Sequence, residues 1–144
     1  MYKGSYQTPS PQDSYSMQKE FHGEPITFVE TIHIKDGVAC DVYSFNENSG
    51  NDLGIVSVAR NVCTPLQKIL KGEKTIEGYV QGAGKLIVRR SNGEAVEYVF
   101  PNKQKEIELH IGDTMQWCAG DSGLIFYEVC YPPYEDGRYE NLTN

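Results

Sequence analysis

Three polar side chains between residues 67 and 79 have the types and the spacing to form a binding site. Gln67, Glu77 and Tyr79 all stand at odd-numbered positions. Residues two apart on a β-strand point to the same face, so this shared parity places the three groups on one side of a sheet. Polar groups persist on a buried face when they bond one another, water or a ligand. If that face is buried, the pattern predicts a hydrogen-bonding pocket for a small polar molecule.

Other residues of the same segment leave a second interpretation open. Lys71 and Glu73 share the odd parity, and a charge buried without a partner is costly. The flank that carries them can therefore face solvent, with Ile76 and Val80 inside. We expect Lys71 and Glu73 to face solvent, and the three polar residues above to face inward.

Two later runs, TMQWC and LIFYEVCY, add residues to the expected pocket. Trp117 and Phe126 are most simply core residues, because a lone tryptophan in a small β domain is usually a packing anchor. We therefore place Trp117 in the wall of the pocket. Tyr127 and Glu128 are adjacent and fall on opposite faces of a strand, so only one of them can reach the interior. We choose Tyr127. The predicted ligand-binding residues are Gln67, Glu77, Tyr79, Trp117 and Tyr127, and no catalytic residue is assigned.

The rest of the sequence has the residue pattern of an all-β domain. Short β-branched and aromatic runs such as ITFVETIHI and VACDVYSF are separated by turn residues, and no window has a helical period. Asn92-Gly93 stands between two such runs and predicts a type I′ turn, which needs positive φ at both residues. Frequent turn signals predict an antiparallel sandwich or a closed barrel.

Length and charge limit the functional classes. The 144 residues suit one domain, and a net charge of −7 opposes binding to nucleic-acid phosphates. No run approaches the roughly 20 apolar residues of a membrane helix, and no apolar secretion signal follows the first methionine. We therefore expect a cytoplasmic protein with neither a membrane nor a nucleic acid as partner.

The four cysteines are scattered without a CxxC spacing: Cys40, Cys63, Cys118 and Cys130. In a chain without a secretion signal, this predicts buried reduced thiols rather than a zinc site or a disulfide framework.

Composition divides the chain into three parts. Residues 1–22 are rich in Ser, Gln, Pro and Tyr, which predicts a flexible N-terminal arm. Residues 23–131 carry the strand pattern of the barrel. Residues 132–144 begin with two prolines and contain Tyr134 and Tyr139, which predicts a tail packing on the barrel. The arm and the open sheet edges together predict a homodimer.

Two segments resemble the motifs of the cupin family of small jelly-roll barrels. GYVQGAGKLIV is similar to the end of the first cupin motif, and IGDTMQWCAGDSG is similar to the second. Gly82 and Gly84 also permit a sharp corner between barrel strands. The resemblance covers most of the ordered chain and implies a double-stranded β-helix, the jelly-roll barrel of the cupins.

The same resemblance implies a barrel without a bound metal or other cofactor. Metal-binding cupins supply a His-x-His pair and a glutamate from the first motif and another histidine from the second. Here the His-x-His places fall at Gln67 and Ile69, or at Ile69 and Lys71 when counted from Gly82, and the late place falls near Gly123. Ile and Gly side chains cannot donate to a metal. The only histidines are His22, His33 and His110, outside the family's ligand positions.

Three functions follow as alternatives. The first is a metal-independent cupin that binds a small polar ligand, such as a carbohydrate, inside its barrel. The second is a metal-independent sugar or sugar-nucleotide isomerase or epimerase, in which a base and an acid move protons next to a carbonyl group. Its base would be His33, His110, Glu77 or Glu128, and its acid Tyr79 or Tyr127. The third is a structural interaction domain without a ligand, because fold resemblance alone does not determine function.

Overall fold

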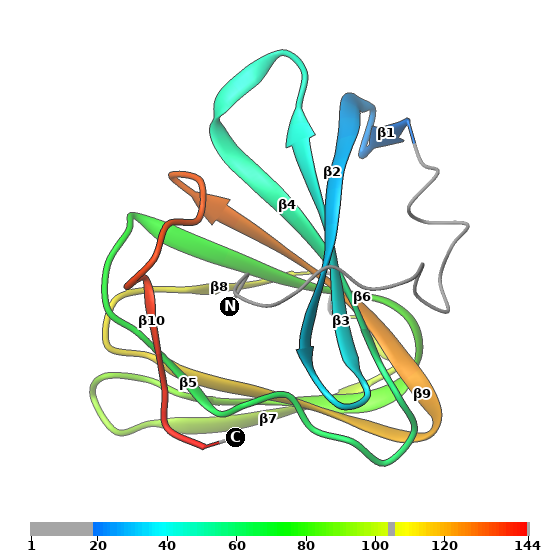
Figure 1. Cartoon of the computed structure of the whole chain (residues 1–144). Helices are drawn as coiled ribbons and strands as arrows, with labels where there is room; N and C mark the ends of the chain where they lie inside the picture. The colour runs from blue at the N-terminus through cyan, green and yellow to red at the C-terminus, as the bar shows by residue number, and fades with distance from the viewer. Residues whose placement is uncertain (1–18, 104–105, 144) are drawn as a thin grey trace.

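The computed structural model describes residues 19–103 and 106–143, and these residues form strands and turns without a helix (Figure 1). The strands are β1 (Glu20–Phe21), β2 (Glu24–Lys35), β3 (Val38–Phe45), β4 (Asn48–Val58), β5 (Gln67–Ile69), β6 (Lys74–Arg89), β7 (Ala95–Phe100), β8 (Glu106–Leu109), β9 (Thr114–Tyr131) and β10 (Tyr139–Asn141). The all-β prediction is confirmed. Most of the segment expected to form an N-terminal arm lies outside the described residues.

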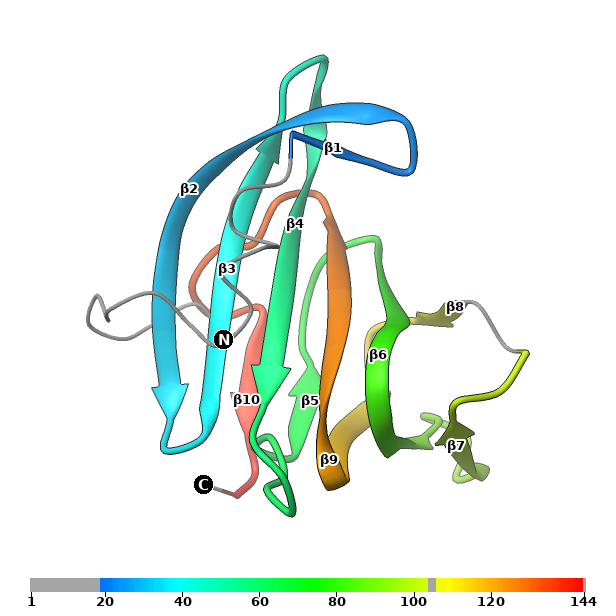
Figure 2. The ribbon, with the colours of Figure 1, turned by 90° about the vertical axis from the view of Figure 1, so that its right-hand side faces the viewer.

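The strands form one curled antiparallel sheet. Its order is β1-β2-β3-β4-β9-β5-β10, and β6 pairs with β7, β8 and β9. Figure 2 shows β2, β3 and β4 on one side of the curled sheet and β6, β7 and β8 on the other. The two long strands, β6 with 16 residues and β9 with 18, run antiparallel over most of their lengths. This arrangement is the predicted jelly roll.

Bulges let the long strands bend between the two halves of the barrel. In β6 the register shifts between Tyr79 and Gln81 and again between Gly82 and Gly84. An extra residue on one strand bends it and increases its twist. Gly82 has a φ of +93°, and a Cβ atom there would collide with the carbonyl oxygen of Gly123. The sharp corner predicted at these glycines therefore joins the first half of β6, beside β8, to its second half, beside β7.

Each face of the curled sheet has its own apolar cluster. Inside the barrel, Trp117 stacks on Phe126 at a centroid distance of 4.4 Å and contacts Phe100 at 5.4 Å. On the outer face, Tyr43 and Ile55 belong to a second buried cluster. Removal of a large apolar side chain from water contributes about 1.5–3 kcal/mol. The expectation that Trp117 and Phe126 pack in the core is confirmed.

The turns differ from the sequence expectation in one respect. Gly93 has a φ of +93°, but Asn92 is not in the left-handed region, so the loop is not type I′. The Gly93 N–H donates to the Arg90 carbonyl, and the Arg90 N–H donates to the Glu94 carbonyl. This three-residue loop is a type I turn followed by a left-handed glycine.

The prediction of four reduced cysteines is wrong for one pair. Cys63 and Cys118 form a disulfide across an isolated bridge between the segment before β5 and strand β9. Their sequence separation of 55 residues conceals this proximity. Cys40 and Cys130 are buried free thiols, as expected.

The C-terminal segment returns to the barrel after β9. Strand β10 pairs with β5, with Tyr139 opposite Ile69 and Asn141 opposite Gln67.

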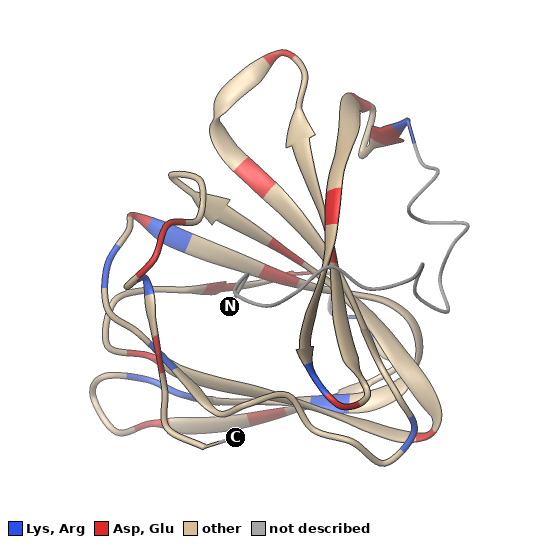
Figure 3. Cartoon of the chain, in the orientation of Figure 1, with Lys and Arg blue, Asp and Glu red and all other residues tan. Residues whose placement is uncertain are grey.

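Lys and Arg residues are scattered over separate elements rather than gathered on one (Figure 3). Within residues 19–103 and 106–143, no helix could cross a membrane.

Candidate ligand-binding site

The five residues predicted to bind a ligand lie in three places. Gln67 lies in the wall of a pocket between β2 and β5. Glu77 and Trp117 are buried inside the barrel and bond to each other. Tyr79 and Tyr127 both line a separate cleft. Tyr79 packs against the interior cluster, as expected, with its ring stacked on Phe100 at a centroid distance of 5.2 Å, whereas Tyr127 belongs to the outer cluster. The structure therefore brings these residues together in two pairs, not in one pocket.

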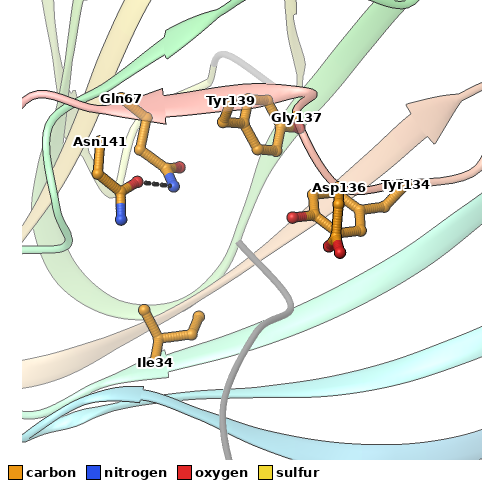
Figure 4. A pocket seen from close by; sticks show the side chains of 7 residues that line it. All are labelled: Ile34, Gln67, Tyr134, Asp136, Gly137, Tyr139 and Asn141. Atoms are coloured by element: carbon orange, nitrogen blue, oxygen red, sulfur yellow. Dashed lines mark hydrogen bonds between the residues drawn. The ribbon is translucent and has the colours of Figure 1, made fainter.

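The pocket that contains Gln67, here called the mouth pocket, is a cavity of about 330 Å³. Figure 4 shows Ile34 of β2 on one side, facing Gln67 and β10 on the other. Its lining residues are Ile34, Gln67, Tyr134, Asp136, Gly137, Tyr139 and Asn141. A volume of this size suits a small ligand.

An amide pair forms one end of the mouth pocket. Cross-strand pairing of β5 with β10 places Gln67 opposite Asn141, and the Gln67 Nε2 atom donates to Asn141 Oδ1 at 2.8 Å. Figure 4 shows the Asn141 amide nitrogen on the side toward Ile34. Within the described parts of the chain, this bond leaves the Gln67 carbonyl oxygen and the Asn141 amide nitrogen without another side-chain partner. The pair can thus offer one acceptor and one donor to a ligand.

Two aromatic rings and a carboxylate form the other end. The rings of Tyr134 and Tyr139 lie 6.0 Å apart with an interplanar angle of 29°. Asp136 lies beside Tyr134 in the same wall (Figure 4). Rings provide an apolar surface, and the carboxylate accepts hydrogen bonds.

Behind this wall lies a buried pair of carboxyl groups. Strands β6 and β9 place Glu77 directly opposite Glu128, and both side chains are fully buried. The indole N–H of Trp117 donates to Glu77 Oε1 at 2.7 Å. Burial raises the pKa of Glu77 well above its usual value, and the adjacent Glu128 raises it further. Glu77 therefore keeps its proton and can donate it to Glu128.

A chain of polar contacts joins this pair to the mouth pocket. The Cys130 thiol donates to Glu128 Oε1 at 3.7 Å. The hydroxyl of Tyr139 lies 3.2 Å from the same sulfur and 3.4 Å from Thr75 Oγ1. Burial, and then the charge of Glu128, raises the pKa of both Cys130 and Tyr139 well above their usual values, so both stay neutral at neutral pH. The ring of Tyr139 thus forms pocket wall on one side, and its hydroxyl reaches the buried polar groups on the other.

Asp52 of β4 is another carboxyl group in this region. Its Oδ2 atom accepts the backbone N–H of Tyr134 at 3.0 Å, which ties the C-terminal segment to β4. Burial raises the pKa of Asp52 from 3.8 to about 6; the Tyr134 bond opposes this shift, and Glu128 adds to it.

This raised pKa predicts a pH-dependent stability. The folded protein holds the Asp52 proton more tightly than the unfolded chain does, so the stabilisation is complete below about pH 4 and is lost as the pH rises through about 6. The loss is on the order of 3 kcal/mol, because each pKa unit corresponds to about 1.4 kcal/mol. We expect the unfolding free energy of Asp52→Asn, measured in urea from pH 4 to 7, to rise relative to wild type across this range. Asparagine can still accept the Tyr134 N–H. A constant difference between the two proteins would contradict the prediction.

The second half of strand β9 faces the opposite way from the sequence expectation. Glu128 points into the barrel, and Tyr127 packs in the outer cluster. The ring of Tyr127 lies over Gly78, where a Cβ atom would collide with it. Its hydroxyl donates to Glu106 Oε2 at 2.6 Å. The interior position expected for Tyr127 is thus held by Glu128.

The histidines proposed as bases lie away from the interior carboxyl groups. His110 is half exposed and contacts Glu108 at 2.7 Å, and His33 lies 3.8 Å from the exposed Asp36. Over the described residues, no group of three His, Cys, Asp or Glu side chains converges as a metal site would require. The acid–base groups that line the mouth pocket are therefore Tyr134, Asp136 and Tyr139, and Cys130 and the two glutamates lie behind Tyr139.

The ligand-binding residues expected from sequence did not include several residues of this region: Thr75, Glu128, Cys130, Tyr134, Asp136, Tyr139 and Asn141. Glu128 was expected only as a candidate base, and Tyr134 and Tyr139 only as part of a tail packing on the barrel. One signal was available, because Phe126 was expected in the core and Glu128 and Cys130 share its parity. For the C-terminal segment the prolines and tyrosines predicted a tail on the barrel, but only the pairing of β10 with β5 shows that its residues reach this pocket.

Comparison with solved structures identifies the architecture as the cupin fold. Capsular polysaccharide assembling protein CapF from Staphylococcus aureus matches with a TM-score of 0.62 and 11% identity, over 83% of this chain and 35% of that chain. Oxalate decarboxylase from Lactobacillus farciminis, in its formate complex, matches with a TM-score of 0.64 and 21% identity, over 76% of this chain and 32% of that chain. Streptomyces PAC13 with uridine matches with a TM-score of 0.57 and 16% identity, over 78% of this chain and 83% of that chain.

These similarities concern the fold. The chain spans about a third of CapF and of the decarboxylase. The sequence itself matches no protein-family model and no curated protein. Any activity must therefore be argued from the site.

Proposed function

We propose that this protein binds a small polar, carbohydrate-like ligand in its mouth pocket without the help of a metal. The observation that carries the proposal is the Gln67–Asn141 pair, which fixes two planar amides at one end of a cavity of about 330 Å³. A sugar hydroxyl both donates and accepts, so it can bond the Gln67 carbonyl and the Asn141 amino group together. The rings of Tyr134 and Tyr139 suit the apolar face of a sugar ring.

The neighbouring structures are consistent with this ligand class. One similar structure is a capsular polysaccharide assembling protein, and another contains uridine, which carries a ribose. Both similarities lie in the fold, so they support the choice of test compounds rather than the identity of the ligand.

Binding can be tested by titrating the protein with uridine, ribose and glucose while recording its NMR spectrum. We expect at least one compound to shift resonances of Tyr139 and Asn141. Asn141→Ala should lower the affinity for that compound about fivefold to tenfold, since a net hydrogen bond contributes about 1 kcal/mol. Asn92→Ala is the matched control, because Asn92 lies in the loop between β6 and β7, outside the pocket lining. An unchanged affinity in Asn141→Ala, or shifts confined to other surfaces, would refute the proposal.

A second function, proton transfer on a bound sugar or sugar nucleotide, is favoured by the buried carboxyl pair. Glu77 holds a proton beside Glu128, and Cys130 and Tyr139 link the pair to the pocket wall. An isomerase or epimerase needs one group to accept a proton from carbon and another to donate one. Incubation of keto sugars with the protein in deuterated water would reveal this activity as exchange at the carbon next to the carbonyl. The activity should disappear in Tyr139→Phe, which keeps the pocket ring; exchange unchanged by that substitution would exclude the route through Tyr139.

A further inference from the structure

The outer face of the barrel carries a second cavity, which shares no lining residue with the mouth pocket. This cleft has a volume of about 550 Å³ and lies where the β1–β2 hairpin approaches strand β6. Its lining residues are Glu20, Phe21, His22, Gly23, Tyr79, Val80 and Tyr127. Figures 1 and 2 show β1 as a short strand folded back on the start of β2. We call it the hairpin cleft.

The hairpin has a defined geometry. His22 and Gly23 have φ values of 49° and 82°, and Phe21 pairs with Glu24. Positive φ at both central residues of a two-residue loop is the type I′ turn, whose twist matches that of the strands. The Ile26 N–H also donates to the Lys19 carbonyl at 3.0 Å. The turn therefore fixes the direction in which Phe21 and His22 project.

Aromatic rings meet at right angles beside this cleft. Phe21 and His22 stack with their centroids 3.9 Å apart. Tyr127 is nearly perpendicular to both, at 72° and 4.8 Å from Phe21 and at 89° and 5.5 Å from His22. A ligand in the cleft thus meets ring planes in two directions. Such a corner resembles part of the aromatic cages that hold quaternary ammonium groups.

The charges near these rings favour a cation. The Tyr127 hydroxyl donates to the Glu106 carboxylate at 2.6 Å, and burial together with this carboxylate raises the pKa of Tyr127, so the phenol keeps its proton. Donation to a carboxylate increases the electron density of the phenol ring. Glu20 supplies a carboxylate to the lining itself, and no Lys or Arg occurs among the lining residues that the structure describes.

We propose that the hairpin cleft binds an organic cation of the quaternary ammonium class, independently of the mouth pocket. Ring faces attract a cation through their quadrupole, and the methyl groups of such a cation bury apolar surface against the rings and Val80. Glu20 lies where it can neutralise the charge. A strongly hydrated cation such as sodium lacks the apolar groups that this lining would contact.

The test compares choline with 3,3-dimethyl-1-butanol, which has the same shape without the charge. We expect choline to shift the NMR resonances of Phe21, His22 and Tyr127, and the alcohol to bind about tenfold more weakly. Phe21→Ala should lower the affinity for choline about fivefold or more, because it removes one of the aromatic rings beside the cleft. Phe28→Ala is the matched control, since Phe28 is a partly exposed ring on β2 that contacts Tyr43 outside the cleft.

Two further variants separate this proposal from the first one. Tyr127→Phe keeps the ring but removes the bond to Glu106, and we expect it to weaken choline less than Phe21→Ala does. Asn141→Ala should leave choline binding unchanged, because Asn141 lies only in the mouth pocket. Equal binding of choline and the alcohol would overturn the proposal, as would an absence of shifts at the three rings. It would also be overturned if sedimentation showed a dimer that Phe21→Ala dissociates, since the cleft would then be an interface between two copies.

Discussion

Replacing Arg138 with methionine should lower the free energy of unfolding by about 3–5 kcal/mol. Arg138 is only 1% exposed, and its guanidinium donates to three backbone carbonyls, those of Lys74, Tyr131 and Pro132. It also donates to Thr75 Oγ1 at 3.1 Å. Methionine fills much of the same volume but donates no hydrogen bond, so buried carbonyls would lose their donor. Urea unfolding at neutral pH measures the change.

The matched control is Arg89→Met. Arg89 is exposed and makes one long contact, 3.5 Å to the Gly93 carbonyl, so its replacement should change stability by less than about 0.5 kcal/mol. Arg138→Lys should lose most of the stabilisation that Arg138 contributes, because one ammonium group cannot reproduce the several hydrogen bonds of the planar guanidinium. Wild-type stability in Arg138→Met would show that the tail is held by β10 pairing instead. A destabilised tail should also lower the affinity of the mouth pocket for its ligand, since the lining residues Tyr139 and Asn141 follow Arg138 in the chain.

The second large effect concerns Glu77. Glu77→Ala should lower the free energy of unfolding by about 2–4 kcal/mol, because it leaves a cavity and removes the buried acceptor of the Trp117 indole N–H. Glu77→Gln should behave differently, since its amide oxygen can still accept from Trp117 and its amide nitrogen can donate to Glu128. The contrast between these two substitutions separates hydrogen bonding from charge.

The pH dependence of this contrast has a definite sign. The pKa of Glu77 is raised in the folded state, so the stability it contributes is present in acid and is lost as the pH rises through that raised pKa. Glu77→Gln should therefore match wild type near pH 5 and exceed it increasingly at alkaline pH. Fluorescence of Trp117, the single tryptophan, reports the same titration from beside the carboxyl group. The exposed Glu97→Ala serves as control. Parallel stability curves for wild type and Glu77→Gln would contradict the assignment.

The fold was accessible from sequence because its signals are local. Strands carried β-branched and aromatic runs, and Gly82 marked the corner within β6. Each of these signals depends on one residue or its near neighbours. The disulfide of Cys63 with Cys118 was not accessible, because it depends on which distant segments lie side by side.

The site was only partly accessible because parity does not survive a bulge or a turn within a strand. In β9 the odd-numbered Trp117 and the even-numbered Phe126 both face the interior, since the strand is irregular between them. Gln67 and Glu77 share a parity but belong to different strands, and β10 and its loop occupy the space near Gln67. Parity from the nearest core residue, Phe126, predicts the inward direction of Glu128 correctly.

The missing side chain at Gly78 has a consequence for how β6 and β9 find their alignment. The ring of Tyr127 occupies the space that a side chain at Gly78, its partner across the ladder, would need. If β6 slipped by two residues, Ile76 or Val80 would lie beneath the ring and collide with it. If β6 slipped by one residue, Glu77 would move to the outer face and lose Trp117. Gly78 thus helps to fix the register of β6 against β9, because among neighbouring registers only the native one leaves space for the Tyr127 ring.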